Sequence, residues 1–376
     1  MNAAAIRDLV RPELPALAPY NAGLLSQAVR SRYGVEQIAR LASNENPFGA
    51  SPGVAQALAG LALRVGTYPD ANCTALRAAI AERTGASAQQ VVIGNGSESI
   101  LQMLCQAFLS PGDRVLTQRP AFGLHEIYPR MMGAQVELLA LTPALEFDLD
   151  AWCEALARGP KIAMLANPSN PVGCMFDAKA FTRLLEATPA GTLLVIDEAY
   201  YEYARRARGF PDALAALRAQ QSPWIVLRTF SKAWGLAGLR VGYGIACDAS
   251  LVQWLDRVRT PFNVNEAAQA AALAAWGDQA FMAQTVAQTV EQREWVVQQL
   301  RAMALPGLRI APSAANFLFI DLARPNGPVN EALLARGIIV KPWKEAGFER
   351  FIRVSIGTAD DNARLLRALG EILGKH

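Results

Sequence analysis

Short runs of apolar and β-branched residues recur through the first two thirds of this chain, and helical patterns, notably at 150–158 and 178–187, separate most of them. A strand that is apolar throughout is buried on both faces of its sheet. The alternation therefore predicts an α/β fold with a mostly parallel sheet of seven strands that helices cover on both faces. The expected strands are 90–94, 114–117, 135–139, 162–165, 192–196, 224–228 and 241–245.

The chain is long enough for two domains, because 376 residues exceed what one hydrophobic core usually supports. After Pro261 the pattern changes to a long helical stretch over 266–304, then short strands and a last helix over 360–373, which indicates a smaller α+β domain. We expect an N-terminal arm and helix that pack with the small domain, a large cofactor-binding domain and the small C-terminal domain. Their predicted ranges are 1–45, 46–262 and 263–376.

Composition excludes several classes of function. The net charge of +3 is too small to indicate a nucleic-acid or membrane partner. The start of the chain lacks a signal-peptide pattern and no long uncharged apolar stretch occurs, so we expect a cytoplasmic protein without a membrane span. Five scattered cysteines indicate reduced thiols, and two histidines, His125 and His376, give little material for a metal site or a Ser-His-Asp triad, so no metal is expected.

Residues 229–243 place reactive side chains inside an apolar, glycine-rich run. Lys232 follows Thr229 and Ser231, and Arg240 comes eight residues later. A Ser-Lys pair alone would indicate only a surface lysine. A desolvated lysine, however, has a lowered pKa and can form a Schiff base with a carbonyl, while the hydroxyls and the arginine are typical phosphate donors. An aldehyde together with a phosphate indicates pyridoxal phosphate, which also needs an acid beside its pyridinium nitrogen.

Loops that follow the expected strands supply further groups. Asp197 ends an apolar run and is the expected acid. With Glu198 it could equally bind magnesium in a nucleotide enzyme, although the chain has no P-loop motif. The loop over 166–173 could be a plain turn, but beside Lys232 and Asp197 its Asn170 can donate to a ring hydroxylate. A glycine turn at 94–96 before a helix predicts an anion site made of free backbone N–H groups.

These motifs resemble the fold type I, class I/II pyridoxal-phosphate-dependent aminotransferases, from about Tyr20 to Leu373. The resemblance rests on residues 167–173, on Asp-Glu-Ala-Tyr at 197–200, on the spacing of Lys232 and Arg240, and on Arg-Val-Ser-Ile-Gly at 353–357. Within this family the chain is most similar to the histidinol-phosphate aminotransferases. The segments that carry this second resemblance are 41–47, 68–70, 94–97, 315–317 and 337–340.

The resemblance implies a role for each cofactor residue. Lys232 would form the Schiff base and move the proton between substrate Cα and cofactor C4′, Asp197 would hold the pyridinium nitrogen, and Asn170 and Tyr200 would bind O3′. Phe122 would stack on the ring, although it reads equally well as a core phenylalanine. The residues implied around the cofactor phosphate are Gly96, Ser97, Glu98, Thr229, Ser231, Arg240 and, from a second subunit, Tyr68. The last of these implies a homodimer with a shared active site.

The expected substrates are histidinol phosphate as amino donor and the 2-oxoglutarate/glutamate pair. Arg353, assisted by Lys341 and Tyr20, is expected to bind their anionic ends, and Asn46 is also placed in the substrate site. Lys341 stands where arginine is common in similar enzymes and loses the planar fork of that side chain.

Two other functions stay open, and a third is disfavoured. Trp343 and Phe262 leave room for an aromatic amino donor, and a phosphothreonine decarboxylase would carry similar motifs around Lys232. A non-catalytic sensor module would require a DNA-binding domain, for which the roughly 40 residues before the Asn-Glu-Asn-Pro segment are too few and insufficiently basic.

Overall fold

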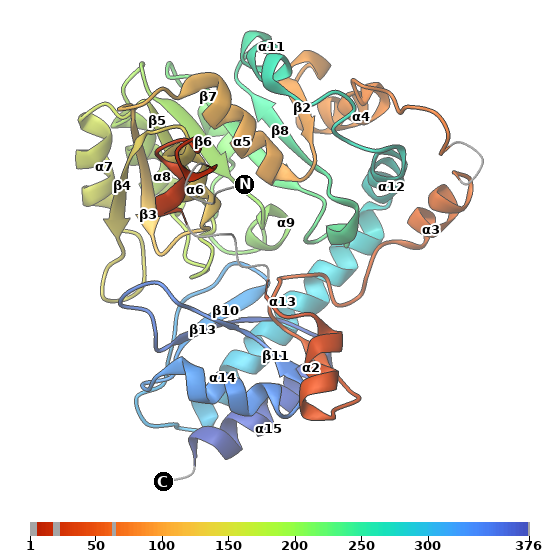
Figure 1. The fold of residues 1–376 in the computed structure, drawn as a ribbon, viewed down its shortest axis with the longest axis vertical. Coiled ribbons are helices and arrows are strands. Elements are labelled where there is room, and N and C mark those ends of the chain that lie inside the picture. Colours follow the sequence, from red (N-terminus) through yellow and green to blue (C-terminus); the bar gives the residue numbers. More distant parts are fainter. Residues whose placement is uncertain (1–5, 18–22, 62–64, 375–376) are drawn as a thin grey trace.

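The computed structural model describes residues 6–17, 23–61 and 65–374, which form two bodies that meet at a pocket (Figure 1). The strands are β1 (Ala39–Arg40), β2 (Val91–Gly94), β3 (Arg114–Arg119), β4 (Gln135–Ala140), β5 (Ile162–Ala166), β6 (Leu193–Asp197), β7 (Trp224–Thr229), β8 (Gly242–Ala246), β9 (Arg309–Ile310), β10 (Phe317–Asp321), β11 (Ile338–Ile339), β12 (Lys341–Pro342) and β13 (Phe351–Ser355). The helices are α2 (Ser26–Tyr33), α3 (Pro52–Ala59), α4 (Thr74–Thr84), α5 (Ser97–Phe108), α6 (Leu124–Met131), α7 (Leu149–Ala157), α8 (Ala178–Glu186), α9 (Tyr201–Ala204), α10 (Ala213–Leu217), α11 (Ala249–Val258), α12 (Glu266–Gly277), α13 (Gln279–Ala302), α14 (Asn326–Leu334) and α15 (Ala359–Leu373).

The larger body is built on a seven-stranded sheet in the order β2-β8-β7-β6-β5-β3-β4. Strand β8 runs antiparallel to both of its neighbours, and the other pairs are parallel. Every residue of β5, β6 and β7 is buried, as continuous apolar runs between two layers of helices require. The predicted α/β fold with a mostly parallel sheet is confirmed, and the carboxyl ends of these three strands lead into the loops that line the pocket.

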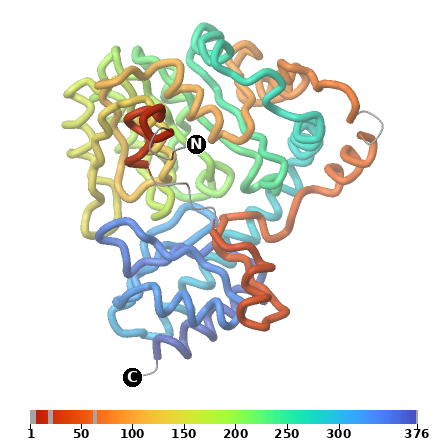
Figure 2. Tube along the Cα trace, in the orientation of Figure 1, coloured from red at the N-terminus to blue at the C-terminus, as the bar shows by residue number. Residues whose placement is uncertain are grey.

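The smaller body contains an antiparallel four-stranded sheet in the order β12-β13-β10-β9. Its core packs the sheet against helices α14 and α15 through buried aliphatic side chains, among them Ile320, Val354 and Leu369. The long helix α13 extends from the larger body into the smaller one (Figures 1 and 2). Helix α12 packs on α3 and α4 of the larger body, and the boundaries at residues 45 and 262 stay predictions.

The N-terminal segment packs on the smaller body. Helix α2 packs Val29 against Leu334 and Ile339 of the smaller body, and β1 pairs in parallel with β11. The predicted N-terminal helix is α2, and it ends at Tyr33 because Gly34 takes the left-handed conformation, with φ 65°. Farther along, the stretch 266–304 divides at Asp278, whose carboxylate caps α13 by accepting from the Phe281 N–H. Among the described residues, no helix is both long and apolar enough to cross a bilayer.

Candidate active site

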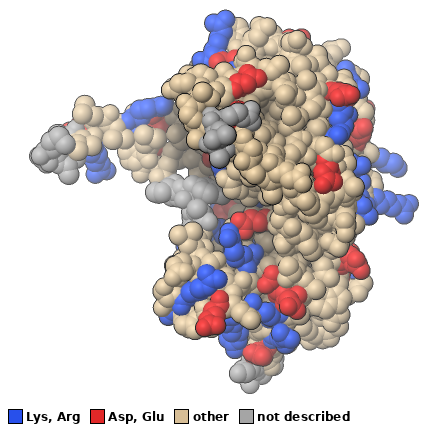
Figure 3. Space-filling view, turned by 90° about the vertical axis from the view of Figure 1, so that its right-hand side faces the viewer, with Lys and Arg blue, Asp and Glu red and all other residues tan. Residues whose placement is uncertain are grey.

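A pocket of about 1210 Å³ lies where the two bodies meet, and the space-filling view shows the surface hollowed there (Figure 3). It receives the loops after β5, β6 and β7, the start of α5, and the segment 341–345 of the smaller body. The pocket brings together most of the side chains predicted from sequence: Ser97, Glu98, Phe122, Asn170, Asp197, Tyr200, Thr229, Ser231, Lys232, Arg240, Lys341 and Arg353.

Lys232 follows β7 and presents its amine inside this pocket. Its Nζ donates to the Ser43 carbonyl oxygen at 3.0 Å and lies 5.9 Å from the centre of the Tyr200 ring. Desolvation, reinforced by the positive charge of Arg353, lowers the pKa of the Lys232 amine from 10.5 to about 7. A large share of the amine is therefore neutral near pH 7, which is the form that attacks a carbonyl or accepts a proton.

Asp197 is the last residue of β6, and both of its carboxylate oxygens are fixed. Oδ2 lies 3.0 Å from His125 Nε2, and Oδ1 accepts from the Ala199 N–H at 3.0 Å. His125 is fully buried in α6 and meets Phe122 edge to face, with ring centres 5.8 Å apart. Sequence reasoning missed this histidine, because a lone histidine far from Asp197 in the chain carries no local signal.

An anion site forms at the start of α5. The helix begins after Gly96 and no side chain caps it, so its first backbone N–H groups are available to an anion. Arg240 places Nη1 3.3 Å from Ser231 Oγ and Nη2 3.3 Å from Glu98 Oε2. Gly96 has φ 78°, and a Cβ there would lie 2.5 Å from Arg240 Nη2, so only glycine lets the guanidinium approach this turn.

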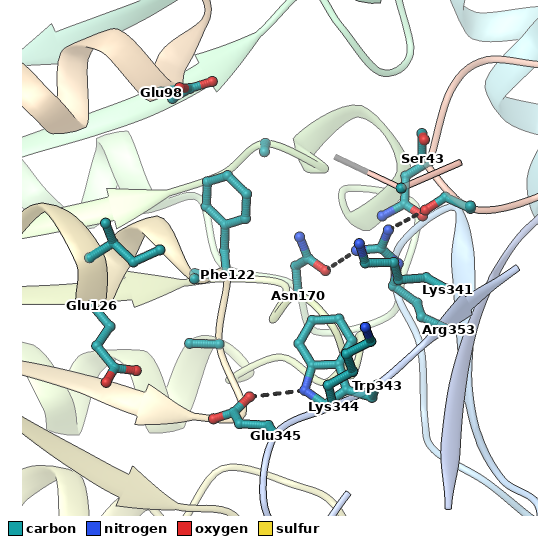
Figure 4. A pocket seen from close by; sticks show the side chains of 18 of the residues that line it. Ser43, Glu98, Phe122, Glu126, Asn170, Lys341, Trp343, Lys344, Glu345 and Arg353 are labelled. Atoms are coloured by element: carbon teal, nitrogen blue, oxygen red, sulfur yellow. Dashed lines mark hydrogen bonds between the residues drawn. The ribbon is translucent and has the colours of Figure 1, made fainter. Parts of the chain in front are cut away.

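Lys341 and Arg353 are neighbouring cations on the side of the pocket that the smaller body provides, which Lys344 also lines (Figure 4). Arg353 Nη1 donates to Asn170 Oδ1 at 2.6 Å, and its Nη2 donates to the Ala42 carbonyl oxygen at 2.5 Å. Lys341 pairs with Arg353 across strands β12 and β13. Burial, together with the charges of Arg353 and Lys344, lowers the pKa of the Lys341 amine. Since Asn170 Oδ1 accepts from Arg353, Nδ2 is the donor that Asn170 can offer to another group.

The structure does not bring every predicted residue to the pocket. Tyr68 is 81% exposed and stacks flat on Phe262, with ring centres 4.4 Å apart. Asn46 is turned away, and its Nδ2 donates to the Ala233 carbonyl oxygen at 2.9 Å. Its neighbour Asn44 lines the pocket instead and donates from Nδ2 to Tyr200 Oη at 2.9 Å. Tyr20 lies outside the described residues.

This set of groups fits pyridoxal phosphate. The uncapped helix start, Arg240 and the hydroxyls of Thr229 and Ser231 suit a phosphate ester. The fixed carboxylate of Asp197 suits a protonated pyridine nitrogen, and the desolvated amine of Lys232 suits an aldehyde. Within the described residues, no cluster of three or more metal-binding side chains occurs.

Known proteins resemble the chain over almost its whole length. The model of the family "Aminotransferase class I and II" matches residues 36–369. Histidinol-phosphate aminotransferase 3 of Rhizobium meliloti is 44% identical over 96% of this chain and 97% of its own, and histidinol-phosphate aminotransferase of Bacillus subtilis is 39% identical over 97% and 99%. The crystal structure of histidinol-phosphate aminotransferase from Sinorhizobium meliloti in complex with pyridoxal-5'-phosphate superposes with a TM-score of 0.87, at 28% identity over 97% of both chains. The chain therefore belongs to the class I and II aminotransferases, as its lysine, acid and anion site already indicated.

Proposed function

We propose that this aminotransferase moves the amino group of histidinol phosphate to 2-oxoglutarate, a step of histidine biosynthesis. The proposal rests on Lys341 and Arg353, which lie opposite each other on neighbouring strands and line the pocket that contains Lys232. Two adjacent cations suit a doubly charged phosphate. The names of relatives up to 44% identical over nearly the full chain support the same substrate.

Bound in this site, pyridoxal phosphate supplies an electron-accepting ring that stabilises negative charge at the substrate Cα. Asp197, held by His125, would keep the pyridine nitrogen protonated, Asn170 and Tyr200 would bind the ring oxygen, and Phe122 would pack against the ring. The cofactor phosphate would be held by the backbone N–H groups of Gly96, Ser97 and Glu98 at the start of α5, and by the side chains of Thr229, Ser231 and Arg240.

Lys232 carries out the proton transfer. Its neutral amine would accept the proton from the substrate Cα and deliver it to the bound cofactor. A pKa of about 7 suits an amine that must both accept and release a proton near neutral pH. Arg353 and Lys341 bind the phosphate of the amino donor in one half-reaction and a carboxylate of 2-oxoglutarate in the other.

The site is completed by a second subunit in this proposal. Tyr68 lies outside its own pocket, is 81% exposed, and is held flat against Phe262. An exposed but oriented tyrosine at this place supports a homodimer in which Tyr68 reaches the cofactor phosphate of the partner. We further propose that the enzyme works in the cytoplasm, where glutamate and 2-oxoglutarate are available.

Aromatic amino-acid transamination is the second candidate, because Trp343 lines the pocket and can contact an aromatic side chain. Phe262, the other aromatic residue considered for this function, does not line the pocket and stacks on Tyr68.

Glutamate formation from 2-oxoglutarate tests the proposal, with histidinol phosphate or phenylalanine as donor. Wild type is expected to use histidinol phosphate. Lys232→Ala should lose at least about a thousandfold in rate, since the base is removed. Lys161→Ala, at a lysine whose side chain is 44% exposed, is the matched control and should keep full activity. Turnover of phenylalanine alone would establish the second candidate, and no glutamate with either donor would refute both.

A further inference from the structure

One carboxylate links the two bodies at the edge of the pocket. Glu345 lies in the segment between β12 and β13 of the smaller body, and its Oε1 lies 3.1 Å from Nε of Arg119, the last residue of β3 in the larger body. Its Oε2 accepts from Trp343 Nε1 at 2.9 Å, as Figure 4 shows. Arg119 also approaches the Ala346 carbonyl oxygen with Nη2 at 3.4 Å.

The backbone of Trp343 is fixed without Glu345. Its N–H donates to the Phe351 carbonyl oxygen at 3.0 Å, and its own carbonyl oxygen accepts from Asn326 Nδ2 at 2.8 Å. Its indole meets Phe319 edge to face, with ring centres 5.9 Å apart. The N–H end of the indole is held by Glu345, so this carboxylate determines the direction in which the ring points.

The position of this indole matters for the substrate. Trp343 and Glu345 line the same pocket as Lys341 and Arg353, and Figure 4 draws the indole below Asn170 and these cations. The phosphate arm, the amine and the ring-bearing side chain of the amino donor are separate substituents around Cα. With the phosphate at the two cations and the amine at Lys232, the side chain points to a third part of the pocket wall, and in the proposal below that part is Trp343. A ring in that side chain gains contact with a fixed indole, whereas the shorter side chain of glutamate gains less.

We propose that Glu345 is a positioning residue that gives the pocket its preference for a ring-containing amino donor. Its carboxylate fixes the Trp343 indole that lines the pocket and anchors it, through an ion pair, to Arg119 of the larger body. The inference rests on the proposed function and names a residue that selects its substrate. The Glu345 carboxylate contacts Trp343 and Arg119 and takes no part in the proton transfer at Lys232, so it acts on the amino donor through Trp343.

The test compares Glu345→Ala with Glu345→Gln in the holoenzyme, using histidinol phosphate and glutamate as separate donors. Loss of a charge-assisted hydrogen bond should lower kcat/KM for histidinol phosphate about tenfold in Glu345→Ala, mainly through KM. The value for glutamate should change less than about twofold, and Glu345→Gln, which keeps an acceptor for the indole, should recover most of the loss. Glu371→Ala is the matched control, because Glu371 also pairs with an arginine, at 3.3 Å, on the smaller body outside the pocket.

Fluorine NMR of protein labelled with 5-fluorotryptophan gives a second readout that needs no turnover. The Trp343 signal, assigned as the one missing in Trp343→Phe, should shift or broaden in Glu345→Ala and stay near its wild-type position in Glu345→Gln. Equal losses for both donors, an effect of the same size in Glu371→Ala, or an unchanged fluorine signal would each overturn the inference. An inactive wild type would instead refute the proposed function, and the substrate preference would fail with it.

Discussion

The amine of Lys232 is expected to react with aldehydes at neutral pH in the apoenzyme. Desolvation and then the charge of Arg353 lower its pKa from 10.5 to about 7. At pH 7 roughly half of the Lys232 amines are then neutral, whereas a solvated lysine with the ordinary pKa has roughly one neutral amine in 3000. If capture of an aldehyde follows the neutral fraction, Lys232 reacts on the order of a thousand times faster than a surface lysine.

The assay is the pH dependence of pyridoxal capture by the apoenzyme, followed by absorbance between about pH 5.5 and 10. Pyridoxal without its phosphate is used because a phosphate titrates near pH 6 and would distort the profile. The rate should reach half its maximum near pH 7 and level off above about pH 8. Arg353→Gln should move the midpoint upward, since it removes a positive charge that disfavours the protonated amine, and Lys341→Gln should move it less. A rate that keeps rising to pH 10, as for a free lysine, would refute the desolvated amine.

Three further results are expected. Lys232→Met should raise the melting temperature of the apoenzyme by about a few degrees at pH 6, because the buried lysine destabilises the wild-type fold there. Between pH 7 and 10.5 the unfolded chain binds more protons than the folded one, so the free energy of unfolding of wild type increases with pH. Calorimetry should therefore show the two melting temperatures converging near pH 10. Gly96→Ala should weaken cofactor affinity about tenfold in a binding titration, since its Cβ would displace Arg240. His125→Gln should lower kcat about tenfold or more, because it removes the imidazole that orients the Asp197 carboxylate, and it should shift the pH dependence of the bound cofactor's absorbance. An unchanged kcat and spectrum would show that His125 does not position Asp197.

The central sheet could be predicted from sequence because each of its strands is a short apolar run and local pattern decides such elements. Helix α6 was not predicted, because Pro129 lies inside it and breaks the expected pattern. That helix carries His125, so the partner of Asp197 was missed with it. Strand β12 is two residues long and includes Pro342, and only its pairing with β13 defines it.

Much of the site can also be predicted from sequence. Asp197 ends one strand of the sheet, and Asn170 and Lys232 follow two neighbouring strands, so the three side chains meet at its carboxyl edge. The sequence does not indicate that Asn44, and not Asn46, lines the pocket, because both residues lie in one loop. The positive φ that turns Asn44 toward Tyr200 depends on tertiary contacts. Contacts between distant segments, such as Arg119 with Glu345, leave no trace in either local sequence.

A single-turnover half-reaction tests the proposed function most directly. The holoenzyme is mixed with histidinol phosphate, glutamate, phenylalanine or phosphothreonine in turn, cofactor absorbance is followed by stopped flow, and carbon dioxide is monitored. We predict fast conversion of the cofactor to its amine form with histidinol phosphate and with glutamate, and no carbon dioxide. Fast conversion with phenylalanine but none with histidinol phosphate, or release of carbon dioxide from phosphothreonine, would contradict the proposed function.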